Sequence, residues 1–341
     1  SWVRGTCQYG VMPSNGLIYV PPNACGCFNQ VKLQGLLAMS GRHSHIPKKT
    51  GGGKLEKGPA YAQLNNQDAN PDNPQSWSMY RHDPERSGVA STRLAAKPAV
   101  AWTANVGGEL TQPVADAERV YVVSTERHSV HALDAGSGKE VWTYIAGGRV
   151  DSAPTLWRGR LIFGCADGWV YCLRAKDGSE AWSVSRPQKS YRMHRYNHLT
   201  SSTPATDGKQ LVVLVSEPDA HTVFAVDLEG KKLWERKFET IISNHGGGVS
   251  PIFYGDRVIL AGDEESRSFL TALDAASGNV LWKTDRANVK TAFSTPCRFV
   301  DPSGTEGLLF NSMAHGITFV DPSTGKTFWE QVDLFDKRTV S

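Results

Sequence analysis

The sequence predicts an all-β protein built from a repeated four-stranded unit, and three observations support this. A Gly that lies four residues before a Trp recurs five times in the 341 residues. A Pro opens the run that leads to each of these motifs. The stretches between them are rich in Val, Ile, Tyr and Phe and are bounded by Gly and Asp, which is typical of strands joined by turns.

The Gly-to-Trp motif sets the period of the repeat. Successive motif tryptophans are 40, 52, 48 and 47 residues apart, and Trp102 lies another 40 residues before the first. Four strands in 40–50 residues is the period of a β-propeller blade. Each Gly is expected at a hairpin turn that needs a positive φ. The five pairs are Gly138/Trp142, Gly178/Trp182, Gly230/Trp234, Gly278/Trp282 and Gly325/Trp329.

Six opening prolines mark six blade-like units, and a complete ring is expected to hold six to eight blades. They are Pro13, Pro113, Pro154, Pro204, Pro251 and Pro296. Residues 1–40 are predicted to form an N-terminal blade unit without the Gly-to-Trp end. Residues 41–97 read as a polar, solvated insertion and lead-in segment. Residues 98–341 read as five blades plus a closing tail, and residues near 330–335 are expected to pair with the N-terminal unit.

Charge is distributed in a way that argues against nucleic-acid binding. Residues 41–97 hold nine Lys or Arg and five Asp or Glu, a balance of +4, so the rest of the chain carries 3 − 4 = −1. A near-neutral body with one basic stretch does not form a nucleic-acid groove. No run of eighteen apolar residues is present, so no membrane-spanning segment is predicted.

The repeats resemble a known family. The pattern of HALDAGSGKEVW (131–142) and TALDAASGNVLW (271–282) is similar to the PQQ-like β-propeller repeats of quinoprotein alcohol dehydrogenases and of the outer-membrane assembly lipoprotein. SWSMYRHDPERSGVA (76–90) resembles the segment that precedes the first blade in such proteins. The resemblance implies a periplasmic or extracellular protein. It also implies that the motif tryptophans pack structurally between blades: Trp142, Trp182, Trp234, Trp282 and Trp329.

The same resemblance raises PQQ and calcium as cofactors. The dehydrogenase branch carries a vicinal Cys-Cys ring near the cofactor and a Glu, Asn and Asp set around Ca²⁺. This chain has no Cys-Cys pair, Cys25-Gly26-Cys27 is not equivalent to one, and the calcium set does not map onto its residues. PQQ and calcium are therefore implied by the resemblance alone, and the residues that hold them in the dehydrogenase branch are not found in this sequence.

Two groups of cysteines are expected to differ. Pairing around the Asp167-Gly168 turn sets 165 opposite 170 and 163 opposite 172, so Cys165 and Cys172 face opposite sides and form no disulfide. Together with Cys297 they are predicted to be buried thiols. Cys7 with Cys25 or Cys27 forms either a disulfide or, when reduced, a metal site.

Alignment on the opening prolines predicts a ligand-binding funnel. The position six residues before Pro is Cys7, His198, His245 or Lys290 in four of the units, and an Asn precedes each His. Positions at one register in successive blades lie on a common ring around one mouth of the channel. The alternative is that Asn-His recurs through repeat ancestry and caps loop backbone. The candidates are Arg149, Asp151, Asn197, His198, Asn244, His245 and Lys290, with Cys7, His198 and His245 as weak metal candidates.

Two further polar stretches are interpreted as solvent-exposed loops and not as binding sites. Residues 190–199 (SYRMHRYNHL) contain Arg and His that could meet an acidic partner, but an exposed connecting loop is favoured. Gly262-Asp263-Glu264-Glu265 could ligate Ca²⁺, but it lacks the spacing of calcium loops, so a solvated turn is favoured.

Three functions remain open at this stage. The leading interpretation is a binding or scaffold module without its own catalysis, which holds a protein partner or a small anionic ligand on its funnel face. The alternatives are a fragment of a PQQ- and Ca²⁺-dependent alcohol or sugar dehydrogenase, and a carbohydrate-binding module. Substrate, partner and oligomeric state do not follow from the sequence.

Overall fold

A computed structural model describes residues 12–14, 17–20, 37–40, 54–64, 76–93, 96–186, 201–240, 246–265, 267–287, 290–337 and 339. These residues form strands and one 3-10 turn, η2 (Tyr61–Gln63), which confirms the all-β fold class. The chain divides into two compact units, residues 1–50 and residues 51–341.

The N-terminal unit contains one small antiparallel sheet. Its strand order is β1-β2-β3, with β1 at Met12–Ser14, β2 at Leu17–Val20 and β3 at Leu37–Ser40. Met12 pairs with Tyr19, and Leu17 pairs with Ser40. The predicted unit therefore contains three paired strands, and its closure of the ring with the tail stays a prediction.

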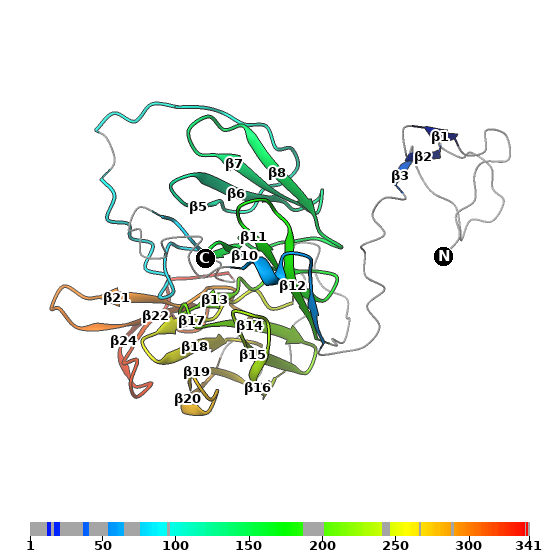
Figure 1. The fold of residues 1–341 in the computed structure, drawn as a ribbon. Coiled ribbons are helices and arrows are strands. Elements are labelled where there is room, and N and C mark those ends of the chain that lie inside the picture. The colour runs from blue at the N-terminus through cyan, green and yellow to red at the C-terminus, as the bar shows by residue number, and fades with distance from the viewer. Residues whose placement is uncertain are drawn as a thin grey trace, which may run out of the picture. The chain divides into compact units, whose positions relative to one another are not determined.

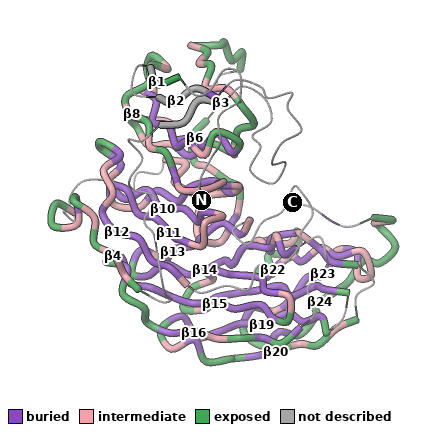
Figure 2. The backbone as a smooth tube through the Cα atoms, turned by 90° about the vertical axis from the view of Figure 1, so that its right-hand side faces the viewer, coloured by how far each residue is buried: buried purple, intermediate pink, exposed green. Residues whose placement is uncertain are grey.

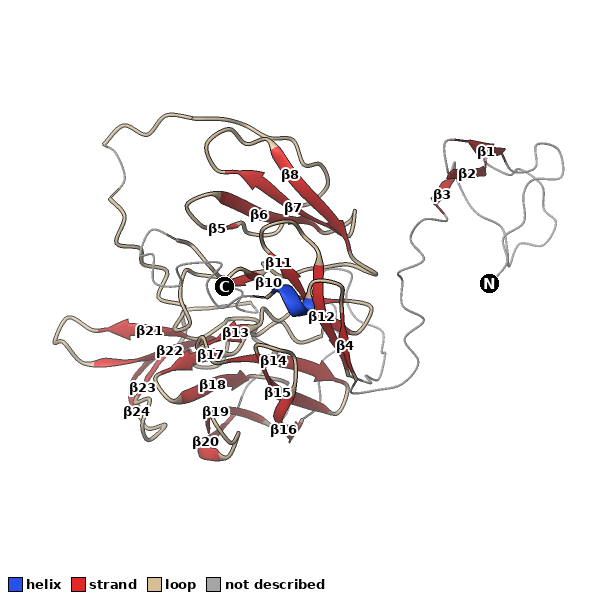
Figure 3. Cartoon of the chain, in the orientation of Figure 1, coloured by secondary structure: helices blue, strands red, loops and turns tan. Residues whose placement is uncertain are grey.

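The second unit contains five four-stranded antiparallel blades, which stand side by side in chain order (Figures 1 and 3). Each blade runs from its innermost to its outermost strand. Blade 1 is β5 (Val114–Ala115), β6 (Arg119–Ser124), β7 (Ser129–Asp134) and β8 (Glu140–Ile145). Blade 2 is β9 (Thr155–Trp157), β10 (Arg160–Cys165), β11 (Trp169–Arg174) and β12 (Glu180–Ser185). Blade 3 is β13 (Ala205–Thr206), β14 (Gln210–Glu217), β15 (Ala220–Asp227) and β16 (Lys232–Glu239).

The last two blades repeat this plan. Blade 4 is β17 (Ile252–Tyr254), β18 (Arg257–Gly262), β19 (Ser268–Asp274) and β20 (Val280–Arg286). Blade 5 is β21 (Cys297–Val300), β22 (Glu306–Ser312), β23 (Gly316–Val320) and β24 (Thr327–Gln331). The five motif glycines each lie at positive φ in the hairpin between the third and fourth strands, as predicted.

The core lies between the blades. The two middle strands of blades 2, 3 and 4 are buried along almost their whole length, whereas outermost strands such as β8 and β24 are largely exposed (Figure 2). Strands buried on both faces read as continuous apolar runs, which explains stretches such as LVVLV in β14. One apolar cluster joins blades 1 and 2, a second joins blades 2 and 3, and a third joins blades 3, 4 and 5.

The motif Trp of each of the first four blades contacts the motif Gly of the next blade. The indole N–H of Trp182 donates to Leu228 O at 2.9 Å, and that of Trp282 donates to Pro322 O at 2.9 Å. A β-bulge follows the residue opposite the Trp in all five blades, for example between Ala272 and Leu273. The same contact therefore recurs at each boundary, and Trp102 makes it against Gly138 at the start of blade 1.

The last motif Trp lies in a different environment. Trp182, Trp234 and Trp282 are buried and Trp142 is half-buried, but Trp329 is 39% exposed. This differs from the interface position that the resemblance implied for it. The physical reason is that β24 is the last strand of the last blade within residues 51–341, so no following blade of that unit lies against the indole ring.

The hairpin of blade 2 has a register one residue away from the predicted one. Cys165 pairs with Trp169, and Cys172 pairs with Ile162. The turn therefore holds three residues, and the last of them, Gly168, has a positive φ of 89°. The two thiols still face opposite sides, are buried and are free, while Cys297 is partly exposed and free.

The stretch at residues 41–97 is not wholly a solvated insertion. β4 (Leu55–Lys57) adds to the outer edge of β12 and makes blade 2 a five-stranded sheet. Residues 77–86, which we call the channel segment, run along the innermost strands, and Met79 and Arg86 are each only 1% exposed. Backbone pairing with the blades, which composition does not reveal, holds both pieces in place.

Candidate functional site

One end of the blades gathers the loops that could form a binding site. Because each blade has four antiparallel strands, the connection into the next blade and the hairpin between the two middle strands lie at the same end. We call this end the mouth. In the described residues it comprises the connections at 146–154, 201–204, 246–251 and 290–296 and the hairpin turns 125–128, 166–168, 218–219, 263–265 and 313–315.

Three of the predicted funnel residues lie at this mouth. Arg149 and Asp151 are in the connection from blade 1 to blade 2, and Lys290 is in the connection from blade 4 to blade 5. The others lie outside the described residues, so their convergence stays a prediction. They are Asn197, His198, Asn244 and His245, together with Cys7, Cys25 and Cys27.

Arg149 and Asp151 form an ion pair beside the channel. Arg149 Nε donates to Asp151 Oδ1 at 2.9 Å, and Nη2 lies 2.8 Å from the same oxygen. The second oxygen of Asp151, Oδ2, is buried and accepts no hydrogen bond from the described residues. A buried carboxylate oxygen without a donor is costly, so it is a natural acceptor for a ligand hydroxyl or a water.

Two serine hydroxyls are also buried without a hydrogen-bond partner among the described residues. Ser152 and Ser202 each lie two residues before the Pro that opens the innermost strand, in blades 2 and 3, and the Oγ of each is buried without a partner among the described residues. In blade 5 the corresponding Ser294 Oγ accepts from Asn311 Nδ2 at 3.3 Å. The sequence analysis passed over these serines because a single Ser before Pro reads as a loop residue.

A chain of buried polar groups links the mouth across blades 3 and 4. Ser216 Oγ lies 2.9 Å from His221 Nδ1, and His221 Nε2 lies 3.1 Å from Glu264 Oε1, close enough for an ion pair but not aligned as a hydrogen bond. Thr291 Oγ1 donates to Glu264 Oε2 at 2.9 Å. Thr291 follows Lys290, so this network fixes the loop that carries a predicted funnel residue.

The acidic stretch at 262–265 is therefore not the solvated turn that was expected. Asp263 and Glu264 are each 2% exposed. Arg286 Nε donates to Asp263 Oδ1 at 2.6 Å, and Ala292 N donates to Asp263 O at 2.9 Å. Arg286 therefore pairs with the Asp263 carboxylate, and His221 and Thr291 contact that of Glu264, so the partners come from strands and loops that are distant in sequence.

The channel segment touches the innermost strand of every blade. Trp77 and Ala115 exchange two backbone hydrogen bonds of 2.8 Å at blade 1. Ser78 O, Pro84 O and Glu85 O accept from the backbones of blades 2, 4 and 5 at 2.7, 2.9 and 3.0 Å. The donors, Leu156, Phe253 and Arg298, each lie two residues after an opening Pro, as does Ala115. The segment therefore forms a belt at one level of the channel.

Arg86 completes the belt at blade 3. Its Nη2 donates to Pro204 O at 3.2 Å, and its Nη1 donates to Tyr80 O at 2.6 Å. Burial lowers the pKa of this guanidinium to about 10. Its Nε has no hydrogen-bond partner among the described residues. The belt is therefore held by a buried cation that bonds to backbone carbonyls.

The described residues do not fit the PQQ and Ca²⁺ set of the dehydrogenase branch. No three His, Cys, Asp or Glu side chains among them gather closely enough to hold a metal. At the mouth, Asp151 is paired with Arg149, and Asp263 with Arg286. Because cations occupy these carboxylates, they are poor ligands for a calcium ion. No catalytic step is therefore derived through that cofactor.

Comparison with known proteins assigns the repeats to a family. The family model of the outer membrane protein assembly factor BamB matches residues 85–240 and 214–340, which span all five blades. The chain belongs to this family. Within it, BamB of Yersinia pestis is 25% identical over 230 residues, which cover 65% of this chain and 53% of that protein.

Quinoprotein dehydrogenases share the same repeats. The dehydrogenase subunit of the quinone alcohol dehydrogenase of Komagataeibacter europaeus is 30% identical over 238 residues, which cover 62% of this chain and 25% of that protein. The quinohemoprotein alcohol dehydrogenase of Comamonas testosteroni superimposes with a TM-score of 0.64 at 16% identity, over 80% of this chain and 52% of that one. This likeness shows the propeller fold alone. The chain spans about half the length of the BamB relative.

Proposed function

We propose that this protein is a propeller scaffold that works outside the cytoplasm and binds a protein partner at its mouth, without catalysis of its own. Its membership of the BamB family supports a role in assembly. In the described residues no helix is long and apolar enough to cross a membrane. The extracytoplasmic location rests on the family relationship and is part of the proposal.

The observation that carries the proposal is the state of the polar atoms at the mouth. Asp151 Oδ2 and Ser152 Oγ, in the connection that enters blade 2, and Ser202 Oγ, in the connection that enters blade 3, are buried without partners among the described residues. A rigid wall of acceptors and hydroxyls suits recognition of backbone amides and polar side chains. The belt of the channel segment supports the same function, because an extended segment already bonds through its backbone to blades 1, 2, 4 and 5 and through the Arg86 side chain to blade 3.

Site-directed photo-crosslinking tests the proposal. A benzophenone amino acid replaces Lys290 at the mouth or, as a control, the exposed Lys209 in the hairpin at the other end of blade 3. The purified protein is irradiated with envelope membranes from its host. We expect a crosslink from position 290 to an outer-membrane assembly protein and none from 209, and Asp151→Asn to weaken it. Equal crosslinking from both positions would contradict a binding face at the mouth.

The quinoprotein alternative is tested separately. The protein is incubated with PQQ and Ca²⁺, and dye-linked oxidation of ethanol and glucose is measured. We expect no dye reduction above that of PQQ and Ca²⁺ alone. Turnover that depends on the protein would replace the scaffold function with that of an oxidoreductase.

A further inference from the structure

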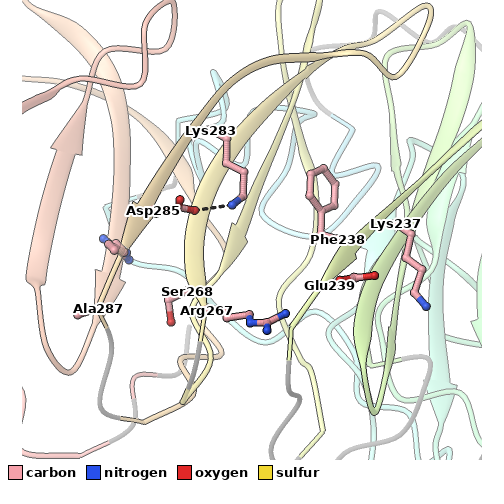
Figure 4. A pocket seen from close by; sticks show the side chains of 9 residues that line it. Lys237, Phe238, Glu239, Arg267, Ser268, Lys283, Asp285 and Ala287 are labelled. Atoms are coloured by element: carbon pink, nitrogen blue, oxygen red, sulfur yellow. Dashed lines mark hydrogen bonds and ion pairs between the residues drawn. The ribbon is translucent and has the colours of Figure 1, made fainter.

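A charged groove separates blades 3 and 4 near their outer strands. Its volume is about 790 Å³, and it is lined by the end of β16, the start of β19 and the end of β20 (Figure 4). These strand ends lie on the mouth side of the molecule, away from the innermost strands that meet the channel segment. The groove is therefore a surface distinct from the polar wall at Asp151.

One aromatic side chain, Phe238, lines the groove, and Phe269 lies behind it. Phe238 and Phe269 pack with ring centroids 5.1 Å apart, and Lys283 Nζ lies 5.0 Å from the centroid of Phe269. Lys283 also pairs with Asp285, so its charge is already satisfied. Apolar side chains of a ligand would find a rigid seat here, because Phe238 and Phe269 belong to the buried core.

Arg267 brings an unpaired cation into the groove. Its guanidinium makes no hydrogen bond or ion pair with the described residues, and in Figure 4 it extends from its strand toward β16. Its backbone has a positive φ of 50°, a conformation that L-residues seldom adopt. Thr240 Oγ1, from blade 3, donates to its carbonyl oxygen at 3.5 Å. The fold therefore holds this cation in place at the boundary of two blades.

The molecule also shows how an extended segment adds to a blade. β4 pairs antiparallel with the outer strand of blade 2, with Leu55 opposite Val184 and Lys57 opposite Trp182. The equivalent strands β16 and β20 are edges of their sheets among the described strands, and an edge strand presents unpaired N–H and C=O groups. β16 has eight residues against the six of β12, so its edge continues into the groove.

We propose that this groove binds an extended acidic segment of a partner protein, which pairs with the edge of β16 and places a carboxylate on Arg267. Apolar side chains of the segment alternate with the carboxylates and lie on Phe238, because successive side chains of a strand point to opposite faces. Lys237 lies on the same rim and pairs with Asp219, whose Oδ2 is 3.7 Å from its Nζ, so Arg267 is the cation that the segment's carboxylate would meet. Glu239 offers a change in the opposite direction, because its carboxylate repels an acidic ligand and its neutralisation should strengthen binding. The inference rests on the proposed scaffold function.

Binding of a model peptide tests the sign of the charge. The probe is a fluorescein-labelled decapeptide of alternating Asp and Val, and fluorescence anisotropy measures its affinity for the full chain. We expect Arg267→Gln to weaken binding about tenfold, because it removes a charge-assisted hydrogen bond to the carboxylate of the peptide. Glu239→Gln should tighten binding two- to threefold. Lys209→Gln, a matched loss of charge at the other end of blade 3, should leave it unchanged.

The outcomes separate this inference from the proposed function. The inference fails if the peptide does not bind the wild type, if Arg267→Gln binds as well as the wild type, or if Lys209→Gln weakens binding equally. In each of these cases a crosslink from position 290 would still support the scaffold. A matched peptide with Lys in place of Asp should not bind. Thermal unfolding of each variant confirms that it is folded.

Discussion

Gly278 of blade 4 lies directly against the indole ring of Trp234 in blade 3. A Cβ added to this Gly would stand 2.5 Å from Cε3 of the ring, and the Gly has a positive φ of 67°. The indole N–H donates to Ala275 O at 2.8 Å. Because this contact recurs at each blade boundary, the repeated Gly and Trp form one unit of cohesion between blades rather than a site for a ligand.

The first prediction compares two motif tryptophans. Trp234→Ala should lower the free energy of unfolding by about 3–5 kcal/mol, because it opens a cavity and leaves Ala275 O without its donor. Trp329→Ala should cost less than about 1 kcal/mol, since this ring is exposed. Urea denaturation followed by tryptophan fluorescence and circular dichroism measures both. Equal losses for the two variants would mean that Trp329 is covered in solution.

The sequence predicted those features that depend on local pattern. The spacing of Gly138 from Trp142 is enough to place a hairpin, because a positive φ and an aromatic ring are needed at fixed positions of every blade. The exposure of Trp329 was not predictable, since it depends on what lies beyond its strand. The burial of Glu264 was missed for a similar reason, because its partners His221 and Thr291 come from other strands and loops.

The channel segment shows the same limit. Residues 77–86 were expected, by resemblance, to belong to a lead-in segment before the first blade, but their place along the innermost strands was not predicted. Their backbone pairs with Ala115, Leu156 and Phe253, whose common register after Pro becomes visible only once the blades are placed side by side. Of the candidate site, Arg149 with Asp151 was anticipated from the register. The unpaired hydroxyl groups at Ser152 and Ser202 were not, because no local pattern distinguishes them.

The second prediction concerns the belt in the channel. Arg86→Ala should lower the free energy of unfolding by about 2–4 kcal/mol, because it opens a buried space and removes the donor of Tyr80 O. Arg93→Ala, at an exposed position, should change it by less than about 0.5 kcal/mol. Chemical denaturation at pH 7 measures both variants. A neutral effect of Arg86→Ala would show that the segment leaves the channel in solution.

The third prediction concerns pH. The Ser277 hydroxyl and backbone N–H bond to Asp274 Oδ1 at 2.6 and 2.8 Å, and these hydrogen bonds lower the pKa of Asp274 from its usual 3.8. The folded state thus binds this proton less readily than the unfolded state, so the stabilisation is present above pH 4 and is lost as the pH falls through the lowered value. Asp274→Asn keeps an acceptor but cannot be protonated in this range.

The urea concentration at the midpoint of unfolding, measured at pH 7 and at pH 3, tests this prediction. The fall in midpoint between the two should be smaller for Asp274→Asn than for the wild type. Asp336→Asn, in the exposed tail, should show the full wild-type fall. If Asp274→Asn and Asp336→Asn behave alike, the turn carboxylate does not contribute to acid sensitivity.

The fourth prediction concerns the thiols. Burial raises the pKa of Cys165, Cys172 and Cys297, but Cys165 and Cys172 are fully buried and free, whereas Cys297 is only partly buried, so a reagent can reach it. Since the thiolate is the nucleophile, iodoacetamide should alkylate Cys297 of the native protein well before the other two. In urea all three should react at similar rates, because unfolding removes the protection. Mass spectrometry of peptides from a timed reaction, after reduction, reads out each position. Alkylation of Cys165 or Cys172 in the native state as fast as that of Cys297 would mean that blade 2 opens readily.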